Sequence, residues 1–205
     1  MSTKERILAE SIQLFNEKGF SNSTMRDIAE RVGISPGNLA YHYKNKDFIV
    51  EELFMQMEEE RKSMLTEAQL IPSFDNINLQ VRQILDLTDK YQFFYLDVLD
   101  IVRAYPNLAE MHRNYIEGHI QYIKAMLDHS VGIGNMRPEA VKGQYQRLAH
   151  TVWMVIFFWL MQEKVRGVES TSEELYKVLQ VMWELVLPHL TEQGMLHFQK
   201  MGAFS

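Results

Sequence analysis

Four side chains that could bind a metal ion or a ligand recur along one stretch of the sequence. His112, Tyr115, His119 and Tyr122 follow one another at i, i+3, i+7 and i+10, so they share one face of a helix. Two histidines at this spacing with no carboxylate partner nearby are a weak pattern for a metal. The set is therefore either the polar lining of a ligand cavity, part of a metal site, or a group of ordinary core and surface residues. We expect no metal site.

Residues for catalysis are hard to find. Asp97 and Asp100 stand three apart in an apolar stretch, where two carboxylates could do acid–base chemistry, but such acids more often cap helices, pair with Arg or face solvent. The chain has no Cys, which excludes disulfides, a Cys nucleophile and Cys-ligated zinc or iron–sulfur clusters. It also lacks a phosphate loop and an HExxH or ExxH carboxylate pair. We expect no catalytic residues, no enzyme activity and no cofactor.

The elements that must position these residues are helices. Only 10 Gly and 5 Pro occur in 205 residues, of which 46% are hydrophobic, and this favours long helices with few breaks. Apolar residues recur at helical spacing and no segment alternates like a strand. The sequence predicts an all-α fold of about nine helices, at residues 4–18, 24–32, 36–43, 45–70, 75–88, 93–103, 107–129, 138–165 and 171–188.

Helix start and stop signals are clearest near the N-terminus. Gly19 and Gly33 are placed to end the first and second helices. Thr24 followed by Asp27 forms a capping box, and Ser35 before Pro36 is an N-cap with Pro at the first helical position. Farther along, Ser170 with Glu173, or Thr171 with Glu174, is a capping box for the last long helix.

The sequence offers no candidate for a membrane span. The longest nearly uncharged apolar run, residues 148–161, would extend about 21 Å as a helix, which is short of the roughly 30 Å core of a bilayer. The N-terminal residues have no apolar stretch typical of a signal peptide. We expect a cytoplasmic protein with no membrane partner.

Charge is divided unevenly along the chain. Residues 1–46 contain seven Lys and Arg and five Asp and Glu, whereas residues 47–205 contain 14 and 22. A slightly basic segment thus precedes a larger acidic one, which suggests a division of labour. We expect two domains, at residues 1–46 and 47–205.

The short turn between the second and third helices has the pattern of a helix-turn-helix, although that pattern alone is common in helical proteins. Its context is more specific, because motifs match in order, in spacing and in distance from the N-terminus. They are Ile7-Leu8-Ala9, Leu14-Phe15, Gly19-Phe20, Ser23-Thr24-Met25, Asp27-Ile28-Ala29, Val32-Gly33-Ile34-Ser35, Gly37-Asn38-Leu39, Tyr41-His42-Tyr43 and Lys46. In these motifs the stretch from Thr3 to Asp47 closely resembles the DNA-binding domain of the TetR family of bacterial transcriptional regulators.

The resemblance implies a helix-turn-helix domain followed by a larger helical domain for ligand binding and dimerisation. The expected function is a sequence-specific transcriptional regulator, most simply a repressor that leaves a palindromic operator in double-stranded DNA when a small apolar or amphipathic effector binds. The alternatives are a DNA-binding regulator without an effector and a helical enzyme. One departure is Ala40, where the family commonly has a Tyr that contacts the DNA backbone.

The resemblance and the chemistry of the side chains together suggest roles in DNA binding. The start of the second helix suits a phosphate, the small residues that open the third helix suit close approach to a major groove, and the later residues suit bases or backbone. The expected DNA contacts are Thr24, Arg26, Ser35, Pro36, Gly37, Asn38, Tyr41, His42 and Lys46. Asn38 is expected to read a base edge, and Lys46 to meet a phosphate as a point charge.

The larger domain is expected to hold a ligand cavity and a dimer interface, because both are usual in the resembled family. The expected cavity residues are Phe94, Tyr95, Tyr115, His119, Tyr122, Trp153 and Phe157. The family dimerises through its last two long helices, here 138–165 and 171–188. The expected homodimer contacts are Ile156, Leu160, Val178, Met182 and Val186, with Trp153 a further candidate.

Overall fold

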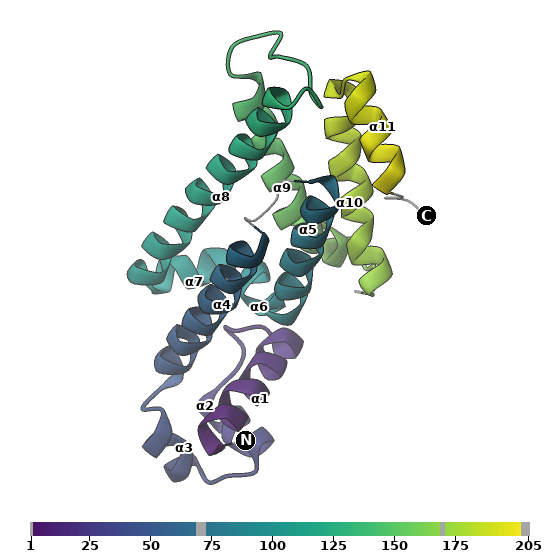
Figure 1. Cartoon of the computed structure of the whole chain (residues 1–205). Coiled ribbons are helices and arrows are strands. Elements are labelled where there is room, and N and C mark those ends of the chain that lie inside the picture. The colour runs from purple at the N-terminus through teal and green to yellow at the C-terminus, as the bar shows by residue number, and fades with distance from the viewer. Residues whose placement is uncertain (1, 69–72, 169–170, 202–205) are drawn as a thin grey trace. The chain divides into compact units, whose positions relative to one another are not determined.

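The computed structural model describes residues 2–68, 73–168 and 171–201, and over these residues the protein is all-α, as predicted (Figure 1). Eleven α-helices and one short 3-10 helix, η1, account for the regular structure described. In the described part of the chain the nearest approach to a sheet is one isolated bridge between Met136 and Leu190. None of the helices described is both long enough and apolar enough to cross a membrane.

Helices follow one another along the described chain. Their bounds are α1 Thr3–Lys18, α2 Met25–Val32, α3 Pro36–His42, α4 Lys46–Ala68, α5 Phe74–Lys90, α6 Gln92–Leu96, α7 Val98–Ala104, α8 Pro106–Gly132, α9 Gln144–Val165, α10 Ser172–Val186, η1 Leu187–His189 and α11 Glu192–Met201.

The chain forms two compact units. Unit 1 comprises residues 1–62 and 87–111, and unit 2 comprises residues 63–86 and 112–205. Unit 1 includes more of the chain than the domain of 46 residues expected from the sequence. The reason is that α4 as far as Lys62, α6 and α7 belong to the same unit, where α6 packs against α1 and α7 packs against α6.

Aromatic side chains form the core of unit 1. Phe15 of α1 is fully buried and contacts Phe20 and Phe93 edge-on, with ring centroids 5.5 and 5.3 Å apart. Phe54 of α4 packs against Phe94 of α6 at 5.1 Å. These contacts join the helix-turn-helix to α4 and α6 in one hydrophobic core.

The capping signals near the N-terminus are confirmed. Thr24 and Asp27 form the reciprocal capping box of α2, and Ser35 caps α3 with Pro36 at its first position. Gly33 ends α2 in the left-handed conformation at φ 73°, which glycine adopts without a steric penalty.

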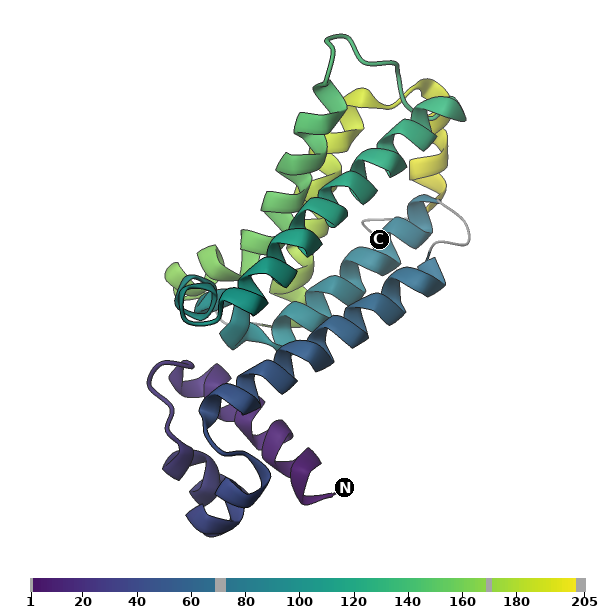
Figure 2. The ribbon, with the colours of Figure 1, turned by 90° about the vertical axis from the view of Figure 1, so that its left-hand side faces the viewer.

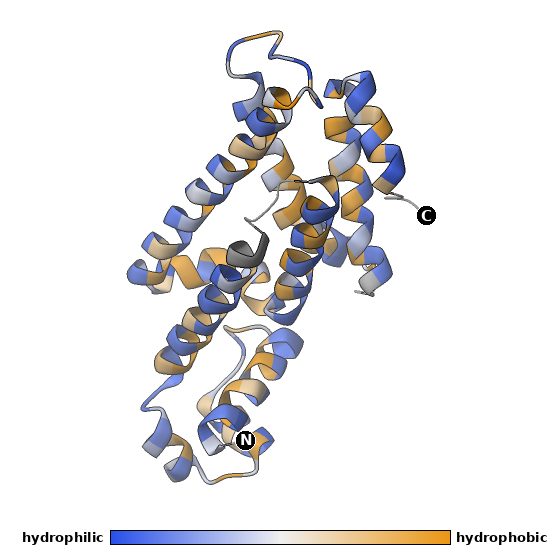
Figure 3. Cartoon of the chain, viewed as in Figure 1, coloured by the Kyte–Doolittle hydropathy of each residue, from blue (hydrophilic) through white to orange (hydrophobic). Residues whose placement is uncertain are grey.

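Unit 2 is built from long helices. Figure 2 shows α5, the later part of α8, α9 and α10, and side chains from all four meet in the interior. Trp183 of α10 is buried between Phe74 of α5 and Phe198 of α11, and its indole N–H donates to Asn78 Oδ1 at 2.6 Å. Apolar and hydrophilic residues alternate in stripes along the helices (Figure 3).

Three helix predictions differ from the structure. The helix expected at 93–103 breaks at Asp97 into α6 and α7. The helix expected from Pro138 begins instead at Gln144, because the carboxylate of Glu139 accepts the amides of Gly143 and Tyr145 and holds the preceding residues in a turn. Helix α11 was not predicted at all. In contrast, Thr171 caps α10 by accepting the amide of Glu174, whereas Ser170 lies outside the described residues.

Candidate nucleic-acid interface and internal cavity

Helix α3 presents a polar face above one buried anchor. Leu39 is fully buried, whereas Ser35, Asn38 and Tyr41 are exposed. The hydroxyl of Ser35 accepts the amide of Asn38 at 3.1 Å and closes the first turn. A single α-helix fits the major groove of B-DNA. The exposed face of α3 can therefore meet base edges while Leu39 holds the helix on unit 1.

Packing does not require Gly37. This residue lies inside α3, and a Cβ added to it would come no closer than 4.0 Å to another atom, the hydroxyl oxygen of Ser35. Glycine within a helix lowers stability by roughly 0.5–1 kcal/mol relative to alanine. A close approach by a partner would account for a residue that the fold itself does not need.

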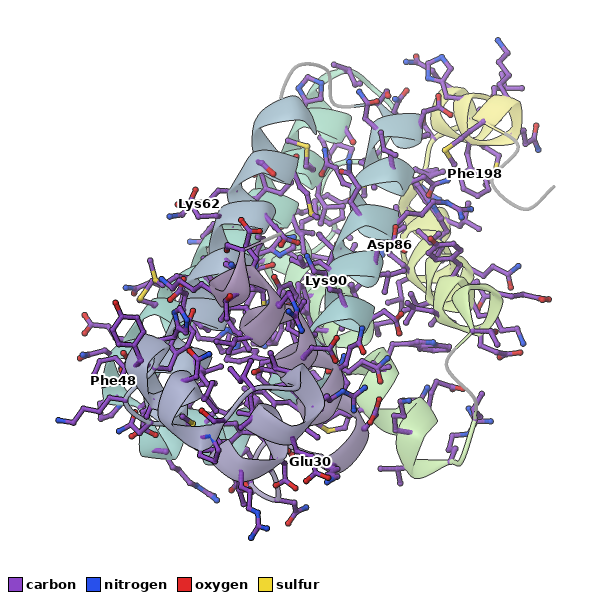
Figure 4. All side chains as sticks on the ribbon, turned by 90° about the horizontal axis from the view of Figure 1, so that it is seen from below. Glu30, Phe48, Lys62, Asp86, Lys90 and Phe198 are labelled. Atoms are coloured by element: carbon purple, nitrogen blue, oxygen red, sulfur yellow. The ribbon has the colours of Figure 1, made fainter. Side chains whose placement is uncertain are left out.

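The other end of α3 carries two aromatic rings. Tyr41 is 85% exposed, and its ring contacts that of His42 edge-on at 5.3 Å. A surface hollow beside them is lined in part by Lys44 and Phe48, and Phe48 is labelled in Figure 4. The sequence pattern indicates no role for either residue, because their exposure beside Tyr41 is evident only in the structure. The exposed Lys44, which shows no ion pair among the described residues, is a further candidate for a phosphate contact.

The start of α2 is less open to an anion than the sequence suggested. The hydroxyl and amide of Thr24, together with the nearby Lys18, lower the pKa of Asp27 to about 2, so this carboxylate is charged at neutral pH. The capping box uses the amides of Thr24 and Asp27. A phosphate at this helix start would have to use the amides of Met25 and Arg26 beside a negative charge.

The two arginines of α2 differ in their surroundings. Arg26 is exposed, as a phosphate contact requires. Arg31 instead bonds to Glu17 at 2.5 Å and to Glu10 at 3.1 Å, and these carboxylates raise its pKa. The charge of Arg31 is therefore balanced inside unit 1, and Arg26 is the arginine of α2 that faces solvent.

Lys46 has partners that the sequence did not predict. Its ammonium donates to the carbonyl of Phe20 at 2.7 Å and to that of Ser23 at 2.8 Å, and it lies 4.1 Å from the centroid of the Phe20 ring. Burial lowers the pKa of Lys46. The side chain expected to meet a phosphate is thus turned into unit 1, where it binds the turn between α1 and α2.

Unit 2 contains a partly open cavity of about 70 Å³ between α5, α8, α9 and α10. Its lining is mostly aliphatic and includes Ile77, Val81, Ile123, Val152, Ile156 and Met182. Ligand pockets in proteins commonly measure roughly 300–1,000 Å³. A ligand of ordinary size would therefore have to be slender or push the walls apart.

Among the residues that the structure describes, the cavity lining contains no Lys, Arg, Asp or Glu. Its polar members are Gln80, His119, Tyr122 and Ser130. The hydroxyl of Tyr122 donates to Gln80 Oε1 at 3.0 Å, and that of Ser130 donates to the carbonyl of Met126 at 2.9 Å. An ionised group would lose its hydration here without meeting a Lys, Arg, Asp or Glu among the described lining residues, so the cavity suits an uncharged and mainly apolar molecule.

The aromatic residues expected around a ligand fall into two groups. His119 and Tyr122 line the cavity. Tyr115, Phe157 and Trp153 lie in a layer next to it: the hydroxyl of Tyr115 is 2.7 Å from His119 Nδ1, the rings of His119 and Phe157 are 5.3 Å apart, and Phe157 stacks on Trp153. No cluster of three or more His, Cys, Asp or Glu among the described residues is placed to hold a metal ion.

Phe94 and Tyr95 do not reach this cavity. Both lie on α6 and are buried within unit 1, with their rings 5.7 Å apart. The sequence showed them only as neighbours in an aromatic stretch, and it could not indicate which core that stretch would join.

The side chains predicted to contact a second protomer are already buried within one protomer, which leaves them little surface for a partner. Each of the five predicted contacts is at most 8% exposed: Ile156, Leu160, Val178, Met182 and Val186. Three of them, Ile156, Met182 and Val186, line the cavity. Trp153 is buried to the same degree. Helix α9 is apolar on nearly every side, so its periodicity did not distinguish the inner stripe from the outer one. The exposed apolar residues of α9 are Met154, Phe158 and Val165.

Comparison with known families covers nearly the whole chain. A family model described as bacterial regulatory proteins of the tetR family matches residues 7–53. A second model, described as a bacterial transcriptional repressor of the TetR type, matches residues 56–198. The first includes the helix-turn-helix, and the second includes the cavity.

Two relatives are similar to parts of the chain. A probable HTH-type transcriptional regulator of Bacillus subtilis, YttP, is 34% identical over 29% of this chain. The negative transcriptional regulator IcaR of the biofilm operon of Staphylococcus epidermidis is 28% identical over 60% of this chain. The matches span 28% of YttP and 64% of IcaR, which is less than two thirds of either relative.

Among solved structures, a TetR-family transcriptional regulator from Marinobacter aquaeolei VT8 is similar over the full length. It has a TM-score of 0.87 and 26% identity and covers 98% of both chains. A putative fatty acid metabolism regulator from Clostridium perfringens shares the fold at a TM-score of 0.63 and 17% identity.

Proposed function

This chain belongs to the TetR family of bacterial transcriptional regulators and is a DNA-binding regulator, and from that premise we propose that it is a homodimeric repressor of a palindromic operator. Two copies of α3 enter successive major grooves, and an uncharged apolar effector in unit 2 releases them. The expected non-enzymatic role agrees with its relatives, which are transcriptional regulators.

The observation that carries the DNA-binding proposal is the exposed face of α3. Ser35, Asn38 and Tyr41 face solvent. Packing within the protein does not require the glycine at position 37, and the absence of a side chain there leaves room for DNA to approach the helix closely. A helix of seven residues offers few base contacts, so one copy would discriminate weakly among sequences. A two-fold dimer doubles these contacts on half-sites about 34–36 Å apart, or a multiple of that spacing.

Selection of bound duplexes from random DNA tests this proposal directly. The full chain is compared with Tyr41→Ala at about 150 mM salt, where non-specific electrostatic binding is partly screened. We expect an enriched palindrome for the wild-type protein and loss of that enrichment for Tyr41→Ala. A folded dimer that enriches no sequence would contradict the proposal.

The role of Asn38 can be tested separately by its effect on base preference. Asn38→Ala should relax preference at one base position and lower affinity by about 1–3 kcal/mol, since a lost bidentate contact to a base has that size. A uniform loss across all duplexes would mean that Asn38 does not read a base. The selected duplex would supply the operator for this comparison.

The effector proposal rests on the uncharged lining of the cavity. Suitable probes are a medium-chain n-alkanol and the n-alkanoate and n-alkylammonium ions of the same length. We expect the alkanol, more than either ion, to raise the melting temperature and release the selected duplex, because an ion would lose its hydration in a described lining without Lys, Arg, Asp or Glu. Release by the ions alone would contradict the proposal, and binding of none would favour a regulator without a small-molecule effector.

A matched pair of variants on α5 locates the effector. Val81→Phe places a ring in the cavity lining, whereas Leu79→Phe places the same ring at a side chain that is 54% exposed. We expect Val81→Phe to abolish the response to the alkanol and Leu79→Phe to retain it. Equal responses in the two variants would place the effector elsewhere.

The homodimer proposal now rests on the outer face of α9. Met154, Phe158 and Val165 are 43, 47 and 84% exposed and stand at helical spacing. Phe158→Arg should shift the protein toward monomer in sedimentation analysis, because the charge would be desolvated at the interface. Leu99→Arg, at an exposed leucine of α7 in unit 1, is the control and should leave the oligomeric state unchanged. A dimer unaffected by Phe158→Arg would exclude this stripe.

A further inference from the structure

The turn between α1 and α2, residues 19–24, is bound by charged side chains from two other segments of unit 1. Lys46, the first residue of α4, donates to the carbonyls of Phe20 and Ser23. Asp97, at the break between α6 and α7, accepts the amide of Phe20 at 2.6 Å through Oδ2. The N–H and the C=O of one residue, Phe20, are therefore held by side chains of opposite charge.

The geometry of Lys46 does not suit a phosphate contact. Two of its three N–H donors are used by carbonyls at 2.7 and 2.8 Å, and the ring of Phe20 covers the ammonium at 4.1 Å. Its side chain is half-buried, and this burial lowers its pKa. A phosphate contact would require the ammonium to give up these partners. By contrast, Lys44, two residues earlier, is exposed.

Asp97 is used for this turn rather than for its own helix. It occupies the N-cap position of α7, yet its side chain makes no capping bond there. Its charge also favours the protonated form of Lys46, as does that of the neighbouring Asp47. The ring of Phe20 completes the attachment, because it contacts Phe15 and Tyr105 edge-on at 5.5 and 6.1 Å.

This attachment bears on DNA recognition because the turn leads directly into α2. The capping box of α2 starts at Thr24, one residue after Ser23, and α2 in turn is followed by α3. Small displacements of a recognition element weaken contacts that need accurate geometry. Hydrogen bonds to charged groups are stronger than those between neutral groups, so two of them on one turn are an effective restraint.

We propose that Lys46 and Asp97 are positioning residues for DNA binding, which act together on the turn between α1 and α2 without touching the nucleic acid. The proposal rests on the DNA-binding function proposed above and assigns a different role to Lys46 from the phosphate contact expected from the sequence. Lys44 is instead the lysine in this region that contacts the DNA backbone.

The two roles of a lysine give different salt dependences. Each neutralised phosphate adds about 0.9 to the slope of log affinity against log salt concentration. Affinity for the selected duplex is measured between about 50 and 200 mM salt by fluorescence anisotropy with the full chain. We expect Lys46→Ala to weaken binding about tenfold with the slope unchanged, and Lys44→Ala to lower the slope by about one.

Asp97 has a matched control three residues away. Asp97→Ala should weaken binding several-fold, whereas Asp100→Ala removes the same charge from an exposed residue, whose ion pair is with Arg103 at 3.8 Å, and should change nothing. In the double variant Asp97→Ala/Lys46→Ala we expect less loss than the product of the single effects, because both residues restrain the same turn. Hydrogen exchange at the Phe20 amide should also accelerate in Asp97→Ala.

The outcomes separate this proposal from the function on which it rests. If the wild-type protein selects no sequence, the DNA-binding proposal fails before these variants are compared. If it selects one and Lys46→Ala lowers the slope by about one, Lys46 contacts a phosphate and the positioning role is overturned. Equal affinities for Asp97→Ala and Asp100→Ala would overturn the role of Asp97.

Should Lys46→Ala fail to fold, Lys46→Gln is used, which keeps two N–H donors without the charge. Retained affinity in this variant supports the positioning role, and a reduced slope of log affinity against log salt concentration refutes it.

Discussion

Helices α3 and α9 differ in how much of each helix is buried. Helix α3 has seven residues, of which Leu39 alone is buried, and the others turn polar or small groups to solvent. Helix α9 has 22 residues and is apolar on nearly every side, with an inner stripe in the core of unit 2 and an outer stripe that is exposed. The first owes its arrangement to local signals and the second to tertiary packing.

This difference explains which sequence-based predictions agree with the structure. A cap, a turn glycine and a proline act within four residues of themselves, so they can be recognised without knowing the fold. An apolar residue on α9 has two possible destinations, the protomer core or a partner. The sequence alone does not choose between them.

The anchor of α3 should matter to folding far more than its exposed residues do. Leu39→Ala removes a fully buried side chain, and such changes lower the free energy of unfolding by about 2–5 kcal/mol. Tyr41→Ala, two residues later and 85% exposed, should change stability by less than about 0.5 kcal/mol. Urea unfolding of both variants, followed by circular dichroism, measures the difference. Similar losses in the two would break the contrast between anchor and surface on α3.

Packing requires the glycine at position 194 in unit 2, whereas it does not require the glycine at position 37 in α3. A Cβ at Gly194 of α11 would lie 2.0 Å from the carbonyl oxygen of Asn135, which is itself held by the amide of Thr191. Gly194→Ala should lower the free energy of unfolding by about 1–3 kcal/mol or more, because the backbone must shift. Differential scanning calorimetry measures the effect. The control is Gly118→Ala on α8, where nothing lies within 4 Å of the added atom and no loss is expected.

How much of the fold could be predicted depends on whether each feature is set by nearby residues in the sequence or by contacts made in the folded chain. The all-α class and the caps of α2 and α3 depend on composition and local pattern, and both were predicted correctly. The break at Asp97 and the late start of α9 coincide with particular side-chain bonds: Asp97 accepts the amide of Phe20, far away in the chain, and Glu139 accepts that of the nearby Tyr145. The spacing of apolar residues along the sequence does not reveal these hydrogen bonds.

Tyr122, which lines the cavity, provides a test in which the expected change in stability is smaller. Tyr122→Phe removes the hydroxyl that donates to Gln80 and should lower the free energy of unfolding by about 1 kcal/mol, the net contribution of one hydrogen bond. It should also leave the cavity more apolar and so strengthen binding of an alkane probe relative to the alkanol. Tyr41→Phe, which alters an exposed ring, is the control and should have no effect on either measurement. An unchanged ratio of the two probes would show that Tyr122 does not face the ligand.

The candidate sites were predictable to different degrees for the same reason. The exposed residues of α3 follow from a turn and a cap, and the structure leaves Asn38 and Tyr41 where a partner can reach them. Lys46 was expected at a phosphate because its position suited one, but the carbonyls that hold it come from a turn 23 to 26 residues earlier in the chain. The role of a flexible charged side chain depends on what the fold brings within its reach.

The smallest expected effect on stability is also the most specific test of α3. Gly37→Ala should raise the free energy of unfolding by roughly 0.5–1 kcal/mol, because alanine favours the helix and the added methyl group meets no atom closer than 4.0 Å. The same change should weaken binding to the selected duplex, because the methyl group occupies the space into which a DNA strand would fit. Thermal unfolding and fluorescence anisotropy measure the two effects on one sample.

A stabilised protein with weaker DNA binding is the pattern that distinguishes an interface glycine from a structural one. Gly118→Ala on α8 is the matched control, since it should gain helix stability in the same way and keep its full affinity for DNA. If Gly37→Ala bound DNA as tightly as the wild-type protein, the start of α3 would not approach the groove closely. Base recognition would then have to come from the other end of the helix, around Tyr41 and His42.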